Sequence, residues 1–505
     1  MLFAELTATS RAVAAASSRL RKVELIADCL RRTPAEEVEI AVVYLSGELR
    51  QRRTGIGWAA FRDPPPPATD PSLQIAEVDA AFERAAGVSG KGATGQRRRL
   101  LHDVLARATA DEQHFIRGLV SGEIRQGALE GVMLDAIARA ADVPGAEVRR
   151  AAMLAGAIAP VAAAALGDGV AGLDRFRLVV GRPVLPMLAQ TAASTEAALA
   201  KLGRAAVEWK LDGVRIQVHR SGSDIAVFTR TLDDVTARLP EVVDAALALP
   251  LTSAILDGEA IALYDDGRPR PFQQTASRAA TRSRDDKTVP LTTYVFDVLH
   301  VDGTDLIALP ATERYAAWAA VLPDPLRVPR IVTDDKDDAQ AFLDQTLARG
   351  HEGVVVKSLD APYDAGRRGA GWLKVKPVHT LDLVVLAVEW GHGRRQGWLS
   401  NLHLGARDPA TGGFVMLGKT FKGLTDEMLR WQTERLLSLA TERSDWVVTV
   451  RPELVVEIAF DGVQSSPRYP GGVALRFARV VRYREDKRSE DADTIDAVLA
   501  FQPRP

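Results

Sequence analysis

The stretch Val207-Glu208-Trp209-Lys210-Leu211-Asp212-Gly213-Val214-Arg215 decides how this chain is interpreted. From Val214 to His219 apolar and polar residues alternate, which predicts a half-buried strand. A buried or half-buried lysine must be paired or deprotonated, and Lys210, close to Asp212 and Arg215 on a strand-loop-strand turn, suits a nucleophile. Taken alone, a lysine near an aspartate and an arginine is more typical of a surface cluster of ion pairs.

Further strand-like segments follow in a fixed order and carry carboxylates, lysines and an aromatic ring. They are residues 255–259, 294–297, 351–357 and 372–376, with a charged segment at 482–487. Lys374 and Lys376 are two residues apart, so a strand would place both on one face. Each segment alone is also typical of a turn, a core aromatic or a solvated face. Their combination in this order indicates nucleotidyl transfer.

With these motifs the chain resembles the ATP-dependent DNA ligases, within the superfamily of covalent nucleotidyltransferases that includes mRNA capping enzymes. Residues 44–49 and 115–127 are similar to the helical DNA-binding domain of archaeal and eukaryotic replicative-type ligases, which capping enzymes lack. This argues against the alternative of an RNA nucleotidyltransferase. A non-catalytic nick-binding protein is the other alternative, and the complete set of motif residues argues against it.

The resemblance implies roles for particular residues. Lys210 is the nucleophile, Glu259 and Glu352 hold Mg²⁺, Glu259 also contacts the ribose, Phe296 stacks on adenine, and Glu208 lies against the base. The remaining contacts to the nucleotide or the reacting phosphates fall to Arg215, Arg230, Arg368, Lys374, Lys376, Arg484 and Lys487. Two carboxylates suit Mg²⁺, a hard cation that prefers oxygen ligands and keeps several waters.

The chemistry requires a neutral lysine amine near pH 7. Because an unperturbed lysine has a pKa of about 10.4, that value must fall by roughly three, which corresponds to about 4 kcal/mol. Nearby cations, namely Arg215, Lys374, Lys376 and the metal, are expected to supply this. The same charges would oppose the negative charge that builds on the α-phosphate as pyrophosphate leaves.

The resemblance also implies three steps. Lys210 takes AMP from ATP, AMP passes to the 5′-phosphate at a nick, and the 3′-hydroxyl displaces AMP. Arg484, Asp486 and Lys487 match a motif that closes over the active site in the first step and swings away afterwards, which predicts a joint near residues 378–381.

Two phenylalanines outside this chemistry, Phe272 and Phe477, each follow a basic, loop-like stretch. The alternative for each is an ordinary core residue. Phenylalanines at the matching places in the family press into the minor groove beside the nick, so both are predicted to bind DNA as apolar wedges.

Composition shifts predict a multidomain chain of 505 residues. We expect an all-α DNA-binding domain at 1–175, an α+β adenylation domain at 176–378 and an all-β OB-fold domain at 379–505. Gly90-Lys91-Gly92 is not a P-loop, because the first glycine of that motif is missing and no Ser or Thr follows the lysine.

The formal net charge of −2 does not exclude a nucleic-acid partner, because affinity depends on where the basic residues face. Local basic clusters occur at Lys91 with 97–99, at Arg278, Arg282 and Arg284, at 394–395 and from 476 to 487; each is also typical of a solvated face. The single cysteine, Cys29, excludes an intrachain disulfide and a cysteine-cluster zinc site, and so argues against NAD-dependent ligases.

The expected partner is nicked duplex DNA, gripped through its phosphates, with ATP and Mg²⁺ as cofactors. The sequence shows no clear sliding-clamp motif, and a monomer is expected. No apolar run is long enough to span a membrane, and residues 1–30 are more typical of a first helix than of a transit peptide. In a prokaryote this predicts a cytoplasmic, nucleoid-associated enzyme of DNA replication, repair or recombination.

Overall fold

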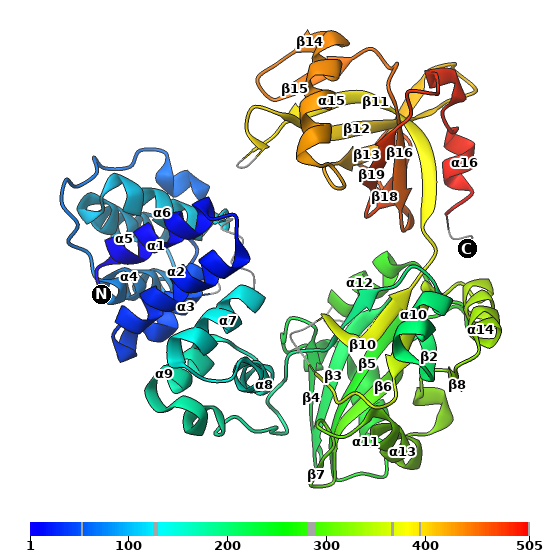
Figure 1. The fold of residues 1–505 in the computed structure, drawn as a ribbon, viewed down its shortest axis with the longest axis horizontal. Helices are drawn as coiled ribbons and strands as arrows, with labels where there is room; N and C mark the ends of the chain where they lie inside the picture. Colours follow the sequence, from blue (N-terminus) through cyan, green and yellow to red (C-terminus); the bar gives the residue numbers. More distant parts are fainter. Residues whose placement is uncertain (52–53, 125–129, 281–288, 365–367, 393–394, 503–505) are drawn as a thin grey trace.

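A computed structural model describes residues 1–505 except 52–53, 125–129, 281–288, 365–367, 393–394 and 503–505. The chain passes in turn through a helical region, a middle region built on two five-stranded sheets, and a β-rich C-terminal region (Figure 1). Within the described parts, no helix combines the length and apolar character needed to cross a membrane.

The N-terminal region is a bundle of α-helices around one core. The helices are α1 (Phe3–Ala15), α2 (Arg19–Arg32), α3 (Val38–Leu45), α4 (Ile75–Gly87), α5 (Ala93–Arg107), α6 (Ala110–Ser121), α7 (Glu130–Ala141), α8 (Gly145–Ala155) and α9 (Ala159–Leu173). Local sequence explains α6 well: Thr109 and Glu112 form a capping box at its start, and Gly122 ends it with a φ of 66°.

A single isoleucine brings together the two segments that resemble a DNA-binding domain. Gly47 follows α3 with a φ of 82°, and a Cβ there would lie 3.1 Å from the carbonyl oxygen of Ile124. At Gly118 in α6 a Cβ would lie 2.8 Å from Cγ1 of the same side chain. The Ile124 side chain therefore occupies space that only glycines leave open, and it joins the end of α3 to the end of α6. Residues 125–127 of the second segment lie outside the described residues.

Two sheets form the middle region. One has the order β4 (Asp224–Thr229), β3 (Val214–Ser221), β5 (Ser253–Ala262), β6 (Leu291–Val301), β7 (Thr304–Asp305); the other has the order β1 (Leu188–Thr191), β10 (Arg368–Val375), β9 (Gly353–Ser358), β2 (Ala205–Lys210), β8 (Arg330–Thr333). Lys210 ends β2 and Val214 begins β3. The loop 211–213 therefore passes from one sheet to the other.

Helices flank both sheets. α10 (Thr195–Leu202) and α14 (Lys336–Ala348) contact each other and β9, whereas α11 (Pro240–Leu247) and α13 (Ala311–Val321) contact β6. α12 (Phe272–Ala280) contacts β5 and lies at the end of the middle region that faces the C-terminal region (Figure 1). Phe272 is the first residue of α12, and residues 263–271 connect β5 to this helix.

The C-terminal region is β-rich, but its sheet does not close into a barrel along the described strands. Its strands are β11 (His379–Trp390), β12 (Leu399–Arg407), β13 (Phe414–Thr420), β14 (Ala440–Arg443), β15 (Val447–Val450), β16 (Val455–Phe460) and β19 (Arg479–Tyr483), with a separate pair of β17 (Gly462–Ser465) and β18 (Val473–Arg476). The order is β13-β12-β11-β15-β14, and β16 pairs with both β11 and β19.

The prediction of an all-β C-terminal domain is wrong because this region also contains α15 (Asp426–Ser438) and the short α16 (Ile495–Leu499). Thr425 caps α15, and Leu429, Gln432 and Leu436, spaced three and four residues apart, are buried on one face of the helix. This helical signal was present in the sequence.

The joint between the middle and C-terminal regions is shorter than predicted and lies earlier in the chain. Residues 379–381 belong to β11, where His379, Thr380 and Leu381 pair with Phe460, Ala459 and Ile458 of β16. Only residues 376–378 lie outside the flanking strands β10 and β11. Ladder pairing of β11 from its first residue makes residues 379–381 part of the C-terminal sheet.

Candidate functional site

The loop after Lys210 is shaped by a glycine that no other residue could replace without displacement. A Cβ on Gly213 would lie 2.5 Å from the carbonyl oxygen of Ala260 and 2.8 Å from Cγ of Glu259. The Gly213 N–H also donates to Glu259 Oε1 over 3.2 Å. The loop can therefore pack directly on β5, and Glu259 is held beside the segment that carries Lys210.

Lys210, Glu352 and Lys376 form the centre of the site. Lys210 pairs with Gly353 in the β2–β9 ladder, which places Glu352, the residue before β9, beside it. Lys210 Nζ donates to Glu352 Oε2, and Lys376 Nζ donates to Glu352 Oε1 over 2.9 Å. Lys210 and Lys376, which are far apart in the sequence, thus both donate to the carboxylate of Glu352.

The surroundings of Lys210 differ from the expectation that cations lie next to it, because its contact is the carboxylate of Glu352. Burial by itself would raise the pKa of Glu352, but the ammonium groups of Lys210 and Lys376 outweigh burial and lower that pKa. The Lys210 ammonium thus contacts a carboxylate, which it shares with Lys376.

For Glu259, in contrast, the effect of burial on the pKa is larger than the effect of the neighbouring positive charges. Burial raises its pKa to about 7, although the positive charges of Arg215 and Lys210 act against this shift. Within the described residues, no group of three or more His, Cys, Asp or Glu side chains is arranged to hold a metal ion. Glu259 and Glu352 are the two carboxylates predicted from the sequence to hold a divalent cation.

Arg215 is bound mainly by protein groups. Its Nε and Nη2 donate to the two carboxylate oxygens of Asp257 over 3.0 and 2.6 Å, and its Nη1 donates to the Met187 carbonyl over 2.6 Å. The Tyr363 hydroxyl donates to the same aspartate over 2.6 Å. Asp257 and Tyr363 were not singled out in the sequence, because a buried acceptor and its donor become recognisable only when their partners are placed.

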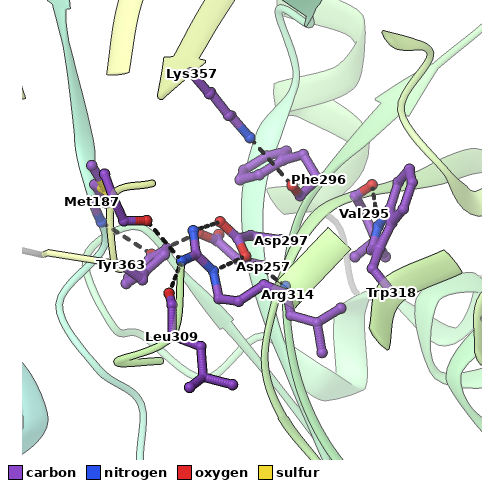
Figure 2. A network of polar contacts seen from close by, with 12 residues as sticks. Met187, Asp257, Val295, Phe296, Asp297, Leu309, Arg314, Trp318, Lys357 and Tyr363 are labelled. Atoms are coloured by element: carbon purple, nitrogen blue, oxygen red, sulfur yellow. Dashed lines mark hydrogen bonds and ion pairs between the residues drawn. The ribbon is translucent and has the colours of Figure 1, made fainter. Parts of the chain in front are cut away.

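A second buried ion pair supports the strand that carries Phe296. Arg314 of α13 donates through Nε and Nη2 to the two carboxylate oxygens of Asp297 over 2.8 and 2.9 Å, and both residues are buried (Figure 2). Arg314 Nη1 also donates to the Leu309 carbonyl over 2.7 Å. A two-point contact of this kind restricts orientation as well as distance, so it holds α13 against β6 next to Phe296.

Phe296 lies among aromatic and cationic groups. Its ring meets Trp372 edge to face at a centroid distance of 5.9 Å, and Lys357 Nζ lies 4.6 Å from its centroid. Lys357 also pairs with the buried Glu208 over 2.6 Å, and Arg330 pairs with the same carboxylate. Glu208 is thus paired with two cations, one of which, Lys357, lies over the ring of Phe296.

The structure brings the other predicted nucleotide contacts together only in part. Lys374 lies in β10, two residues before Lys376, and pairs with Val355 of β9. Arg230 follows β4 and is exposed. Arg368 begins β10, but its side chain lies outside the described residues.

The C-terminal region reaches the site through a second set of contacts. Arg476 donates to the two carboxylate oxygens of Asp212 over 2.6 and 3.2 Å, and Lys376 Nζ donates to Asp461. A cavity of about 280 Å³ lies between the two regions, and its lining includes Glu352, Lys376, Asp461 and Arg476. Asp212 was noticed in the sequence only as a neighbour of Lys210, and Asp461 was not noticed.

Phe272 and Phe477 lie on opposite sides of this interface. The Arg476 guanidinium is 5.5 Å from the ring centroid of Phe272 and 5.8 Å from that of Phe477. Phe477 is 56% exposed, so the core alternative is excluded for it, whereas Phe272 is half-buried. Phe477 also has a φ of 54°, in the left-handed region that side chains with a Cβ rarely adopt.

Arg484 and Lys487 are held away from Lys210 in this structure. Both donate to Asp382 Oδ2 of β11, over 2.9 and 2.5 Å, and Arg484 also pairs with Asp486 over 2.7 Å. The face of the C-terminal region that carries Asp461, Arg476 and Phe477 is the one directed at the site.

The basic clusters differ in their surroundings. Arg278 is buried and pairs with Glu241, so it is a structural residue, and Arg97 donates to the carbonyls of Ala85 and Val88. The acceptors of Arg278 and Arg97 lie far from them in the sequence or on the backbone, so the sequence does not reveal that these two arginines are held by the protein. Arg282, Arg284 and Arg394 lie outside the described residues.

Comparisons with known proteins agree with this arrangement. Residues 186–376 match a family model described as ATP dependent DNA ligase domain, residues 395–487 match the ATP dependent DNA ligase C terminal region, and residues 60–138 match the DNA ligase N terminus.

Full-length relatives and a solved structure extend these matches. A probable DNA ligase of Mycolicibacterium gilvum is 61% identical over 509 residues, with 100% of each chain covered. One from Anaeromyxobacter dehalogenans is 61% identical over 507 residues, with 99% of each chain covered. The solved structure called Pmar-Lig_PreS3 has a TM-score of 0.62 and 17% identity, covering 95% of this chain and 99% of that one. At this identity the structural likeness concerns the fold alone.

Proposed function

The chain belongs to the ATP-dependent DNA ligase family, and from this premise we propose that Lys210 carries AMP between ATP and nicked duplex DNA. The enzyme seals nicks using ATP. The observation that carries the assignment of Lys210 is its position at the end of β2, where Glu352, Glu259 and Lys376 converge on it from three other segments.

In the first step Lys210 Nζ, having lost its proton, forms a bond to the α-phosphorus of ATP as the bond to pyrophosphate breaks. An oxygen of the 5′-phosphate at the nick then attacks the same phosphorus and releases Lys210. Finally the 3′-hydroxyl attacks the 5′-phosphorus, and AMP leaves. Lys374 and Lys376 stabilise the negative charge that develops on the phosphoryl oxygens.

The residues present fit a divalent cation. Glu259 and Glu352 offer hard oxygen donors, and substrate phosphate with water would complete the coordination that two carboxylates leave open. Mg²⁺ bound there would compete with Lys210 for Glu352 and help neutralise the phosphates. Glu352 would then release the lysine at the stage at which a neutral amine is needed.

Support for the nucleotide pocket comes from the surroundings of Phe296. Adenine would stack on this ring, while Glu208, paired with Lys357 and Arg330, would accept from the exocyclic amine of the base. Arg215, Arg230 and Arg368 are proposed to act near the ribose and phosphates. We propose an OB-fold for the C-terminal region and domain boundaries at 1–175, 176–378 and 379–505.

A direct assay tests the proposed function. Purified protein is incubated with a nicked DNA duplex and Mg²⁺, with ATP or NAD as nucleotide, and with RNA ends as the competing substrate. We expect sealing of the DNA nick with ATP, together with a gain of the mass of AMP by the chain. Sealing that requires NAD, or transfer of nucleotide to RNA ends only, would contradict the proposal.

The wedge role of Phe477 is tested by two substitutions. Phe477→Ala removes the ring, and Phe477→Gly also relieves the left-handed backbone, a strain of about 1–3 kcal/mol. We expect both variants to form the AMP adduct normally, to seal nicks about 10-fold more slowly, and to discriminate differently against 3′ mismatches, as Phe272→Ala should also do. Single-turnover sealing and thermal unfolding measure these effects.

Trp446→Ala serves as the control, because Trp446 is a 69% exposed aromatic on the β14–β15 hairpin of the same region. It should seal at the wild-type rate. If the Phe477 variants lose adduct formation and melting temperature together, the ring has a structural role and the wedge hypothesis is wrong.

A further inference from the structure

Asp461 is the one acidic side chain that the described C-terminal region brings into contact with Lys376. It occupies the turn between β16 and β17, its side chain is 10% exposed, and its N–H donates to the Arg476 carbonyl over 3.0 Å. Its second carboxylate oxygen lies 3.7 Å from Arg479. Asp461 is thus fixed to the same face as Arg476 and Phe477.

We infer that Asp461 is a positioning residue that orients the Lys376 ammonium for nick sealing, and that it does so only when this face of the C-terminal region lies on the site. The inference rests on the proposed function of Lys210 and Lys376. Its basis is that Lys376 donates both to Asp461 of the C-terminal region and to Glu352 of the middle region. None of the proposed roles of Lys376 requires the contact with Asp461.

The geometry explains what this contact does. A lysine ammonium has three N–H donors at the end of a flexible four-carbon stem. In Lys376 one N–H goes to Glu352 and one to Asp461. Because the bonds of the ammonium nitrogen are tetrahedral, fixing two N–H bonds also fixes the direction of the third. The third N–H is therefore oriented in advance for a phosphate oxygen. Burial disfavours the charged form of Lys376, but its bonds to Asp461 and Glu352 outweigh burial and raise its pKa above the usual value.

The contact is specific to one arrangement of the regions. Arg484 and Lys487, proposed to act on pyrophosphate in the first step, are bound to Asp382 and lie on a different part of the C-terminal region. Rotation about residues 376–378 that brought them over Lys210 would carry Asp461 away, because Asp461 is held to Arg476. Lys376 would then be oriented by Glu352 without Asp461 during self-adenylation.

The inference predicts a step-specific defect in Asp461→Asn. This change keeps the shape of the side chain but removes its charge. We expect sealing of a pre-adenylated nick to slow by about 10- to 100-fold, because small misplacements of a catalytic group have effects of this size. The rate of self-adenylation with ATP should stay within about 2-fold of wild type, and Asp461→Glu should recover part of the sealing rate.

Two controls separate positioning from a structural role. Glu453→Gln removes an exposed carboxylate of the same region, paired with Arg451, and should leave both rates unchanged. In a Lys376→Ala background, Asp461→Asn should have no further effect on sealing, since the two residues act through one contact.

The outcomes are distinct. Equal slowing of both steps, additive effects of the two substitutions, or wild-type sealing by Asp461→Asn would each overturn the inference. A wild-type chain that takes no AMP at Lys210 would instead overturn the proposed function.

Discussion

With Lys210 replaced by alanine, the enzyme will form no detectable adduct with AMP, whereas the wild-type chain will gain the mass of AMP. The reason is covalent: the side-chain nitrogen is one end of the bond that holds AMP, and alanine offers no substitute. The same variant should still close a pre-adenylated nick to some extent, because the amine takes no part in the last step. Mass spectrometry of the intact chain and a gel assay of sealing measure both results.

Lys201→Ala is a suitable control for this experiment. Lys201 belongs to the same region, lies on α10, is exposed and donates to Gln190 over 3.2 Å. This variant should be adenylated like wild type. AMP that remains on the chain after Lys210→Ala would show that another residue is the nucleophile.

Replacing Arg484 or Lys487 by alanine should slow self-adenylation by about 100- to 1000-fold, which is the range for removing one preorganised group that stabilises developing charge. Pyrophosphate leaves only in the first step, so sealing of a pre-adenylated nick should change far less. Both side chains are bound to Asp382 in the present structure, and reaching the phosphates requires them to leave this carboxylate. Rapid-quench measurements of each step separate the two effects.

Arg482→Ala provides the matched control, because Arg482 belongs to the same segment and its side chain is 64% exposed and paired with Glu457. It should have little effect on either step. Equal losses in both steps for Arg484→Ala, with a lower melting temperature, would mean that its bonds to Asp382 and Asp486 serve only the fold.

Much of the site was accessible from sequence because its members occupy short segments of regular structure. The alternation after Val214 predicted β3, but the strand is not half-buried as expected, since Gln217 and His219 are buried as well. The spacing of Lys374 and Lys376 predicted one face of a strand, whereas only Lys374 lies in β10 and Lys376 follows its last residue. The order of motifs pointed to Glu352 and Lys210 as members of one site, and the β2–β9 ladder places them side by side. The sequence led us to expect cations next to Lys210, whereas in the structure its side chain contacts the carboxylate of Glu352.

Buried ion pairs were the part that sequence reasoning missed. Asp257 with Arg215, and Asp297 with Arg314, are formed by residues 42 and 17 positions apart. An aspartate in a strand is equally compatible with a solvated face, and only the placement of its partner shows that it is buried. Arg278 illustrates the same point, since it was counted with a basic surface cluster and is a buried partner of Glu241.

The sequence by itself determined the succession of a helical, a mixed and a β-rich region, because this depends on residue type, spacing and periodicity along the chain. The class of chemistry, with Lys210 as the predicted nucleophile, came from ordered motifs that resemble those of DNA ligases. Only the tertiary structure decided which face of the C-terminal region meets the site, that Asp461 reaches Lys376, and that Arg484 and Lys487 rest on Asp382. Contacts of this kind join residues 85 or more positions apart. The Asp461–Lys376 contact depends on how two regions dock, whereas the contacts of Arg484 and Lys487 with Asp382 depend on packing within the C-terminal region. Local patterns encode neither.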